Sequence, residues 1–341
     1  MAYISFQPSD YFNTKLYTGT GAENAISDIG FNPDWVWFKK RSASEHHFVY
    51  DQVRGALKKI APSNTNAEGT ETQTLKSFDT GGYTLGTSAE VNGSSTTYVA
   101  WNWLANGSGS ANSDGSISST VSANTTAGFS IVKWTGTGSN ATVGHGLSTA
   151  PRVIIAKNLG TTQNWFVFNK GLYDTDSTAY INLNTTDGKS QSSTVWQSTA
   201  PTSSVFSTGA AFSAHDYVAY CFSDVKGFSK SGVYSGNNSS DGTYIHLGFK
   251  AAWVMVKRYG ANGFGWAMYD NKRDPDNVVE GVLNADTTSA EDTATDWLDI
   301  TSSGIKFRTT GGDVNASSDY IYHAFAEHPI VSSNDIPATA R

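Results

Sequence analysis

The sequence has 341 residues, of which 13% are aromatic and 16% are charged, so it can bury a substantial core and wholesale disorder is excluded. Its formal net charge of −7 argues against a nucleic-acid-binding surface. Abundant Ser, Thr, Gly and aromatic residues suit strands joined by short turns and predict an all-β protein.

Signals for disulfides, membranes and export are missing from the sequence. Cys221 is the single cysteine, which excludes an intrachain disulfide framework and a cysteine-rich metal site. No run of about 18 apolar residues is present, so we expect no membrane insertion. Residues 1–6 lack the basic region and the long apolar core of a signal peptide, so we expect no export by the secretory route.

The chain contains the same ordered set of four features three times, with nearly constant spacing. An aromatic residue, a small residue and a glycine come first, followed by an apolar run that ends in lysine. A second apolar segment and a tyrosine-led segment complete the set. In the three copies the features lie at 17–19, 35–39, 48–51 and 98–101, at 134–136, 153–157, 166–169 and 217–220, and at 234–236, 253–257, 267–270 and 320–323.

Each copy holds six or seven expected strands with turn signals about every 8–12 residues, which is typical of a β-sandwich. We therefore predict three tandem sandwich repeats. The predicted order is a docking segment at 1–15, repeat one at 16–106, a Gly/Ser/Thr-rich linker at 107–127, repeat two at 128–226, repeat three at 227–329 and a tail at 330–341.

The connections between the repeats predict their mobility. The stretch 107–128 is either a flexible linker or an extended arm that pairs with a neighbour. Repeats two and three join without a spacer, so we expect them to pack rigidly, with repeat one set apart. The leader contains four aromatic residues and should dock, either on its own domain or on a partner.

The candidate binding residues surround the third feature in repeats one and three. A glycan site needs aromatic faces beside planar polar side chains on loops. Tryptophans 165, 196 and 266 are expected to be exposed on loops, whereas Trp35, Trp37, Trp101 and Trp103 fit a core. An Asp–Arg brace that fixes a turn is the alternative for the arginines. The predicted ligand-binding residues are His46, His47, Tyr50 and Arg54, with Trp266, Tyr269, Asp270 and Arg273.

No constellation of residues predicts catalysis. The glycine turns at 19–21 and 136–138 do not open helices, so they are not phosphate loops. No serine stands in a rigid turn beside a usable base. The carboxylate pairs at 174–176 and 274–276 fit solvated loops, with calcium binding or catalysis as alternatives. We expect no enzyme activity, no catalytic or metal-binding residues and no cofactor.

Several segments resemble a known family. In repeat one these are residues 17–19, 30–39, 51–55 and 98–103, and in repeat two they are residues 122–132, 145–147 and 150–151. They are similar to an uncharacterised repeat domain of virion and tail-fibre-like structural proteins of tailed bacteriophages, especially marine phages that infect cyanobacteria. Repeat three resembles the family only through the internal repeat.

The resemblance implies sandwiches of the lectin-like type, either jelly-roll or concanavalin-like. It implies a phage structural protein on the exterior of the virion, made in the host cytoplasm, that presents these modules to host-surface polysaccharide. The alternatives are an adaptor, connector or capsid-decoration protein that binds only other virion proteins, and a polysaccharide depolymerase. We expect a homo-oligomer, with a trimer favoured, because sandwiches with open edge strands gain stability by association.

Overall fold

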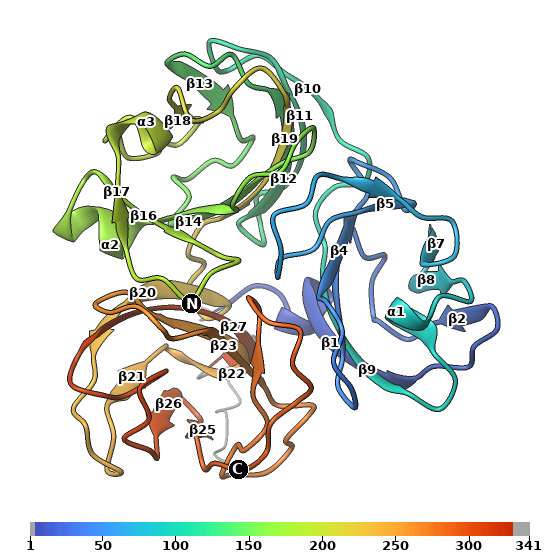
Figure 1. The fold of residues 1–341 in the computed structure, drawn as a ribbon, viewed down its shortest axis with the longest axis vertical. Helices are drawn as coiled ribbons and strands as arrows, with labels where there is room; N and C mark the ends of the chain where they lie inside the picture. The colour runs from blue at the N-terminus through green and yellow to red at the C-terminus, as the bar shows by residue number, and fades with distance from the viewer. Residues whose placement is uncertain (1–3, 330–341) are drawn as a thin grey trace.

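The computed structural model describes residues 4–329, which fold almost entirely into antiparallel strands. Figure 1 shows three lobes around a common centre: lobe one contains β1–β9, lobe two β10–β19 and lobe three β20–β27. The helices described are short. They are η1 (Pro8–Asp10), α1 (Ala89–Asn92), α2 (Lys170–Thr175) and α3 (Ser193–Trp196), and none of them is long and apolar enough to cross a membrane. The prediction of an all-β protein is confirmed.

One strand order recurs in the main sheet of every lobe. Lobe one has the order β1 (Phe12–Thr18), β9 (Thr97–Trp103), β3 (Trp35–Lys40) and β4 (Phe48–Asp51). Lobe two repeats it as β12 (Phe129–Thr135), β19 (Asp216–Phe222), β14 (Val153–Asn158) and β15 (Phe166–Asn169), followed by β16 (Ala179–Asn182) and β17 (Ser190–Gln191). Lobe three has β20 (Ser229–Ser235), β27 (Asp319–Pro329), β22 (Phe249–Arg258), β23 (Trp266–Asp270) and β24 (Leu283–Asn284).

A smaller sheet packs against the outer face of each main sheet and closes a local core. These sheets are β2 (Asn24–Ile26), β8 (Gly82–Leu85) and β7 (Leu75–Asp79) in lobe one, β13 (Ala141–Gly144) and β18 (Val205–Thr208) in lobe two, and β21 (Tyr244–His246), β26 (Gly304–Phe307) and β25 (Leu298–Thr301) in lobe three. Lobe one also has a hairpin of β5 (Lys58–Lys59) and β6 (Gly69–Thr70).

The inner faces of the three main sheets meet in one shared core. On β3, Val36 and Phe38 point to the core of lobe one, whereas Trp35 and Trp37 point to the centre. Trp35 stacks on Tyr220 of lobe two at a ring distance of 4.4 Å. Strands buried on both faces read as continuous apolar runs, which is why the second sequence feature is almost uninterrupted.

Close approach of the backbone explains the glycine of the first feature. A Cβ atom at Gly19 would lie 2.2 Å from the Gly93 carbonyl oxygen, and corresponding contacts of 2.3 and 2.1 Å would arise at Gly136 and Gly236. The aromatic residue two positions earlier stacks on the tyrosine that opens the fourth feature, as Tyr17 does on Tyr98 at 5.1 Å. These turns are therefore packing sites where a side chain does not fit.

The flexible linker predicted at 107–127 is wrong, because the stretch contains two strands of the sheet of lobe two. Residues 110–112 form β10 (Ser110–Asn112) and residues 119–124 form β11 (Ser119–Asn124), which pair with each other and extend the sheet of lobe two beyond β12. The polar composition suits β10, an edge strand with little burial. Lobe one is also not set apart, because its four core tryptophans lie in the shared core.

The leader docks on the chain itself. Residues 12–15 already belong to β1, and the rings of Phe6 and Tyr11 contact Phe228 of lobe three at 5.5 and 6.2 Å. The predicted tail at 330–341 lies outside the described residues.

Candidate functional site

The strongest polar cluster of lobe one lies at its seam with lobe two. Asp51 ends β4 and accepts hydrogen bonds from the Arg54 backbone nitrogen at 2.8 Å and from Arg54 Nε at 2.5 Å. Arg54 also pairs with Glu68 at 3.2 Å. The Tyr220 hydroxyl of lobe two donates to Asp51 Oδ2 at 2.8 Å. The side chains of Asp51 and Arg54 are 0% and 1% exposed, so this brace joins two lobes in the interior.

The same brace recurs between lobes three and one. Arg273 Nε donates to Asp270 at 2.5 Å and Arg273 Nη1 donates to Glu291 at 2.8 Å. Trp101 of lobe one donates from Nε1 to Asp270 Oδ2 at 3.0 Å, in the place that Tyr220 takes at the first seam. Burial lowers the pKa of Arg273, but Asp270 and Glu291 raise it more, so its pKa stays above the ordinary arginine value.

The third seam, between lobes two and three, keeps the turn without the charges. Asn169 accepts the backbone N–H of Leu172 at 3.2 Å, as the aspartates do for their arginines. Leu172 is fully buried in the arginine position. His323 of lobe three faces this seam, and both it and Asn169 line a small, mostly apolar cavity.

The acidic partner is replaced at the third seam as well. The backbone nitrogens of Glu68, Lys189 and Glu291 donate to the equivalent carbonyl of the next lobe in the ring. Lys189 therefore stands where the other seams have a glutamate. The arginine and both carboxylates are thus absent together at this seam. An arginine buried here without the carboxylates would be a charge without compensation.

Three buried lysines close the ring at the same seams. Lys39, Lys157 and Lys257 end the apolar runs of β3, β14 and β22, and burial lowers the pKa of each to about 8. Each ammonium donates to one or two carbonyls of its own lobe and to one carbonyl of a neighbouring lobe. The neighbouring carbonyls are those of Thr288 for Lys39 at 3.0 Å, Thr65 for Lys157 at 3.2 Å and Thr185 for Lys257 at 3.1 Å.

The predicted ligand-binding residues do not form an exposed edge. His47, Tyr50, Trp266, Tyr269, Asp270 and Arg273 are buried, as is the side chain of Arg54, and only His46 is partly exposed. They do not form one site either. Tyr50 and Tyr269 lie in the local cores of lobes one and three. Arg54 contacts lobe two, whereas Trp266 contacts Asn182 of lobe two from lobe three. The alternative interpretation, an Asp–Arg brace, describes what the arginines do.

The three tryptophans expected on exposed loops are also buried. Trp165 donates from Nε1 to the Ala61 carbonyl of lobe one at 3.1 Å, and Trp266 donates to the Asn182 carbonyl of lobe two at 2.9 Å. A loop residue that leads into a strand on the shared core is covered by the next lobe. The sequence interpretation missed this role, although a lysine ending an apolar run in all three copies was a signal of buried polar joints.

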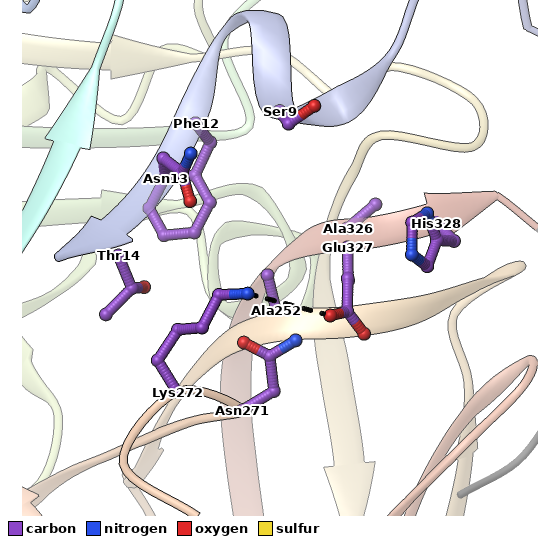
Figure 2. A pocket seen from close by; sticks show the side chains of 10 residues that line it. All are labelled: Ser9, Phe12, Asn13, Thr14, Ala252, Asn271, Lys272, Ala326, Glu327 and His328. Atoms are coloured by element: carbon purple, nitrogen blue, oxygen red, sulfur yellow. Dashed lines mark ion pairs between the residues drawn. The ribbon is translucent and has the colours of Figure 1, made fainter. Parts of the chain in front are cut away.

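A polar pocket of about 200 Å³ opens at the seam of lobes one and three. Figure 2 shows β1 on one side of this seam pocket, and β22, β27 and the turn after β23 on the other. Lys272 Nζ lies 4.0 Å from Glu327, which also pairs with Lys250 at 3.1 Å. The residues that line the seam pocket are Ser9, Phe12, Asn13, Thr14, Ala252, Asn271, Lys272, Ala326, Glu327 and His328.

A second pocket, of about 250 Å³, includes His46. His46 Nδ1 lies 2.8 Å from the Ser63 hydroxyl, and Lys59 pairs with Glu90 at 2.7 Å. The three charged or imidazole side chains that line this pocket, His46, Lys59 and Glu90, thus all have partners. In the part of the chain that the structure describes, no group of three or more His, Cys, Asp or Glu side chains could hold a metal ion.

A family model described as a domain of unknown function (DUF7483) matches residues 7–329. The match spans all three lobes, in agreement with a core that the lobes share. No curated protein and no solved structure matches the chain.

Proposed function

We propose that this chain, which belongs to the DUF7483 family, is a structural protein of a bacteriophage virion. In this proposal it is a fibre or surface-appendage subunit on the exterior of the particle. Its lobes are sandwiches of the lectin-like type and present a surface for attachment to host polysaccharide. The observation that carries the proposal is the resemblance of segments in repeats one and two to phage virion proteins. These segments are residues 17–19, 30–39, 51–55, 98–103, 122–132, 145–147 and 150–151.

The way the lobes are joined supports a mechanical role. Three lobes share one aromatic core, and buried braces or lysines connect each lobe to the next. Such a body resists local opening, because separating any pair of lobes exposes core aromatics and leaves polar groups unpaired. A particle that remains intact outside a cell needs parts of this kind.

A second candidate is a connector or capsid-decoration protein that binds only other virion proteins. The burial of seven of the eight predicted ligand-binding residues favours it, because it removes the exposed aromatic edge expected for glycan attachment.

Both candidates are tested on virions of the phage that encodes the chain. Antibody labelling of intact particles should locate the protein on the exterior, and the purified full-length chain should compete with virions for adsorption to host cells. External labelling without competition would favour the connector. Absence of the protein from purified particles would overturn both candidates.

A further inference from the structure

We propose that the seam pocket between lobes one and three binds an uncharged saccharide, with room for about one pyranose residue. The proposal names a ligand for the attachment role above and rests on that role only for the source of the saccharide. The pocket is built from η1 and β1 on one side and from β22, β27 and the turn after β23 on the other (Figure 2).

The size and the chemistry of the pocket suit a small polyhydroxylated molecule. Its volume of about 200 Å³ corresponds to roughly six or seven water molecules. Hydroxyl, amide, imidazole, ammonium and carboxylate groups line it together with the ring of Phe12. Ligand sites combine such apolar contact with a few convergent polar groups that orient the ligand.

Thr14 provides an unused hydrogen-bonding group at this site. It is 8% exposed, and its Oγ1 has no hydrogen-bond partner among the described residues. Across the pocket, Asn271 is 3% exposed and also lines the wall. Buried hydroxyls are usually paired in folded proteins. The hydroxyl of Tyr83 is unpaired too, but it lies in the core of lobe one, whereas Thr14 lines a pocket that a ligand can enter.

The charges of the pocket favour a neutral ligand. Burial raises the pKa of Glu327, but the hydrogen bond and the charge of Lys250 lower it more, so the carboxylate stays ionised. Lys272 stands 4.0 Å from this carboxylate. Glu327 would repel an anion and Lys272 would repel a cation. Sugar hydroxyls, in contrast, can donate hydrogen bonds to the carboxylate and accept them from the ammonium.

Binding at this place also couples to stability. Because the pocket takes residues from two lobes, a ligand that contacts both sides holds the seam closed, and it raises the melting temperature by mass action. The coupling gives a readout that is independent of host adsorption.

The test uses the purified full-length chain, with D-glucose, D-galactose and N-acetyl-D-glucosamine as probes and with D-glucuronate and glycine as charged comparators. Saturation-transfer NMR and thermal melts measure binding. We expect at least one uncharged sugar to bind and to raise the melting temperature, with weaker or no effect of the comparators.

Two variants locate the binding. Thr14→Val removes the unpaired hydroxyl without a loss of fold stability and should lower the affinity for the sugar at least tenfold. Lys272→Ala, at a side chain that is 48% exposed, should lower this affinity by a similar factor. The matched control is Tyr83→Phe, which removes another unpaired buried hydroxyl in the core of lobe one.

Failure of all three uncharged sugars to bind at millimolar concentration, stronger binding of a comparator, or equal binding by the Thr14→Val and Lys272→Ala variants would overturn the proposal. These outcomes leave the virion assignment untouched, because particle labelling and adsorption are measured separately.

Discussion

The hydroxyl of Tyr220 donates a hydrogen bond to the buried carboxylate of Asp51, 169 residues earlier in the chain and in another lobe. Trp101 makes the corresponding contact with Asp270, again across 169 residues. One carboxylate thus fixes a turn within its own lobe and accepts a donor from the next lobe. The contact joins lobe one to lobe two and lobe three to lobe one, so at two of the three seams the brace links lobes as well as fixing a turn.

The first prediction concerns Arg54. Arg54→Ala leaves the buried Asp51 without its cation, whereas Glu68 keeps Lys58 at 3.8 Å. The free energy of unfolding should fall by about 3–5 kcal/mol. Urea denaturation measures it. The control is Arg308→Ala, where an exposed pair with Asp299 at 3.6 Å is lost and a change below about 1 kcal/mol is expected. Equal effects of the two substitutions would contradict the role of the brace.

The second prediction concerns the uncharged seam. Leu172→Arg alone places a charge beside Asn169 and Lys189 and should destabilise the chain by about 3–5 kcal/mol. Combining it with Asn169→Asp and Lys189→Glu rebuilds the cluster of the other seams and should recover about half of that loss or more. A mutant cycle by urea unfolding measures the coupling, and additive effects would show that the three positions act independently.

The third prediction concerns the buried lysines. Their folded pKa of about 8 lies below the unfolded value of 10.5, so the unfolded chain binds more protons between these pH values. The lysine contribution to stability therefore rises from pH 8 to pH 10, by at most about 1.4 kcal/mol per pH unit and group. Lys157→Met should reduce this slope, measured by urea unfolding at several pH values. Lys133→Met, at a partly exposed lysine, should leave the slope unchanged.

The fourth prediction concerns acid stability. Burial lowers the pKa of His323 to about 3, below the ordinary value of 6.5, so stability falls as the pH drops from 6.5 towards 3. His323→Tyr introduces the residue type found at Tyr220 and should reduce the loss between pH 6.5 and pH 4. Thermal melts across this range measure the effect. His246→Tyr, at an exposed histidine, serves as the control and should behave like the unmodified chain.

The fifth prediction concerns assembly. We expect a homo-oligomer, with a trimer favoured, because β10 ends the main sheet of lobe two as an open edge that another copy can cover. Light scattering at micromolar concentration should give a multiple of the 36.5 kDa chain mass. A monomer under these conditions would mean that the shared core already provides, within one chain, the burial that association was expected to supply.

The sequence by itself determined the all-β class and the correspondence of the three copies. Alternation along a strand places Trp35 and Trp37 on one face, and the repeated glycines and tyrosines mark the same packing contacts in each lobe. These features depend on neighbours within one lobe, so a local pattern reports them.

Only the tertiary structure decided what covers each face. The alternation along a strand indicates which side chains share a face. It does not distinguish an exposed recognition edge from a buried seam, because both contain the same types of aromatic and charged residues. Trp266 and Arg273 fit both interpretations until the loops of the neighbouring lobes are placed over them. The physical reason is that their partners lie in other lobes, where no periodicity of the local chain can indicate them.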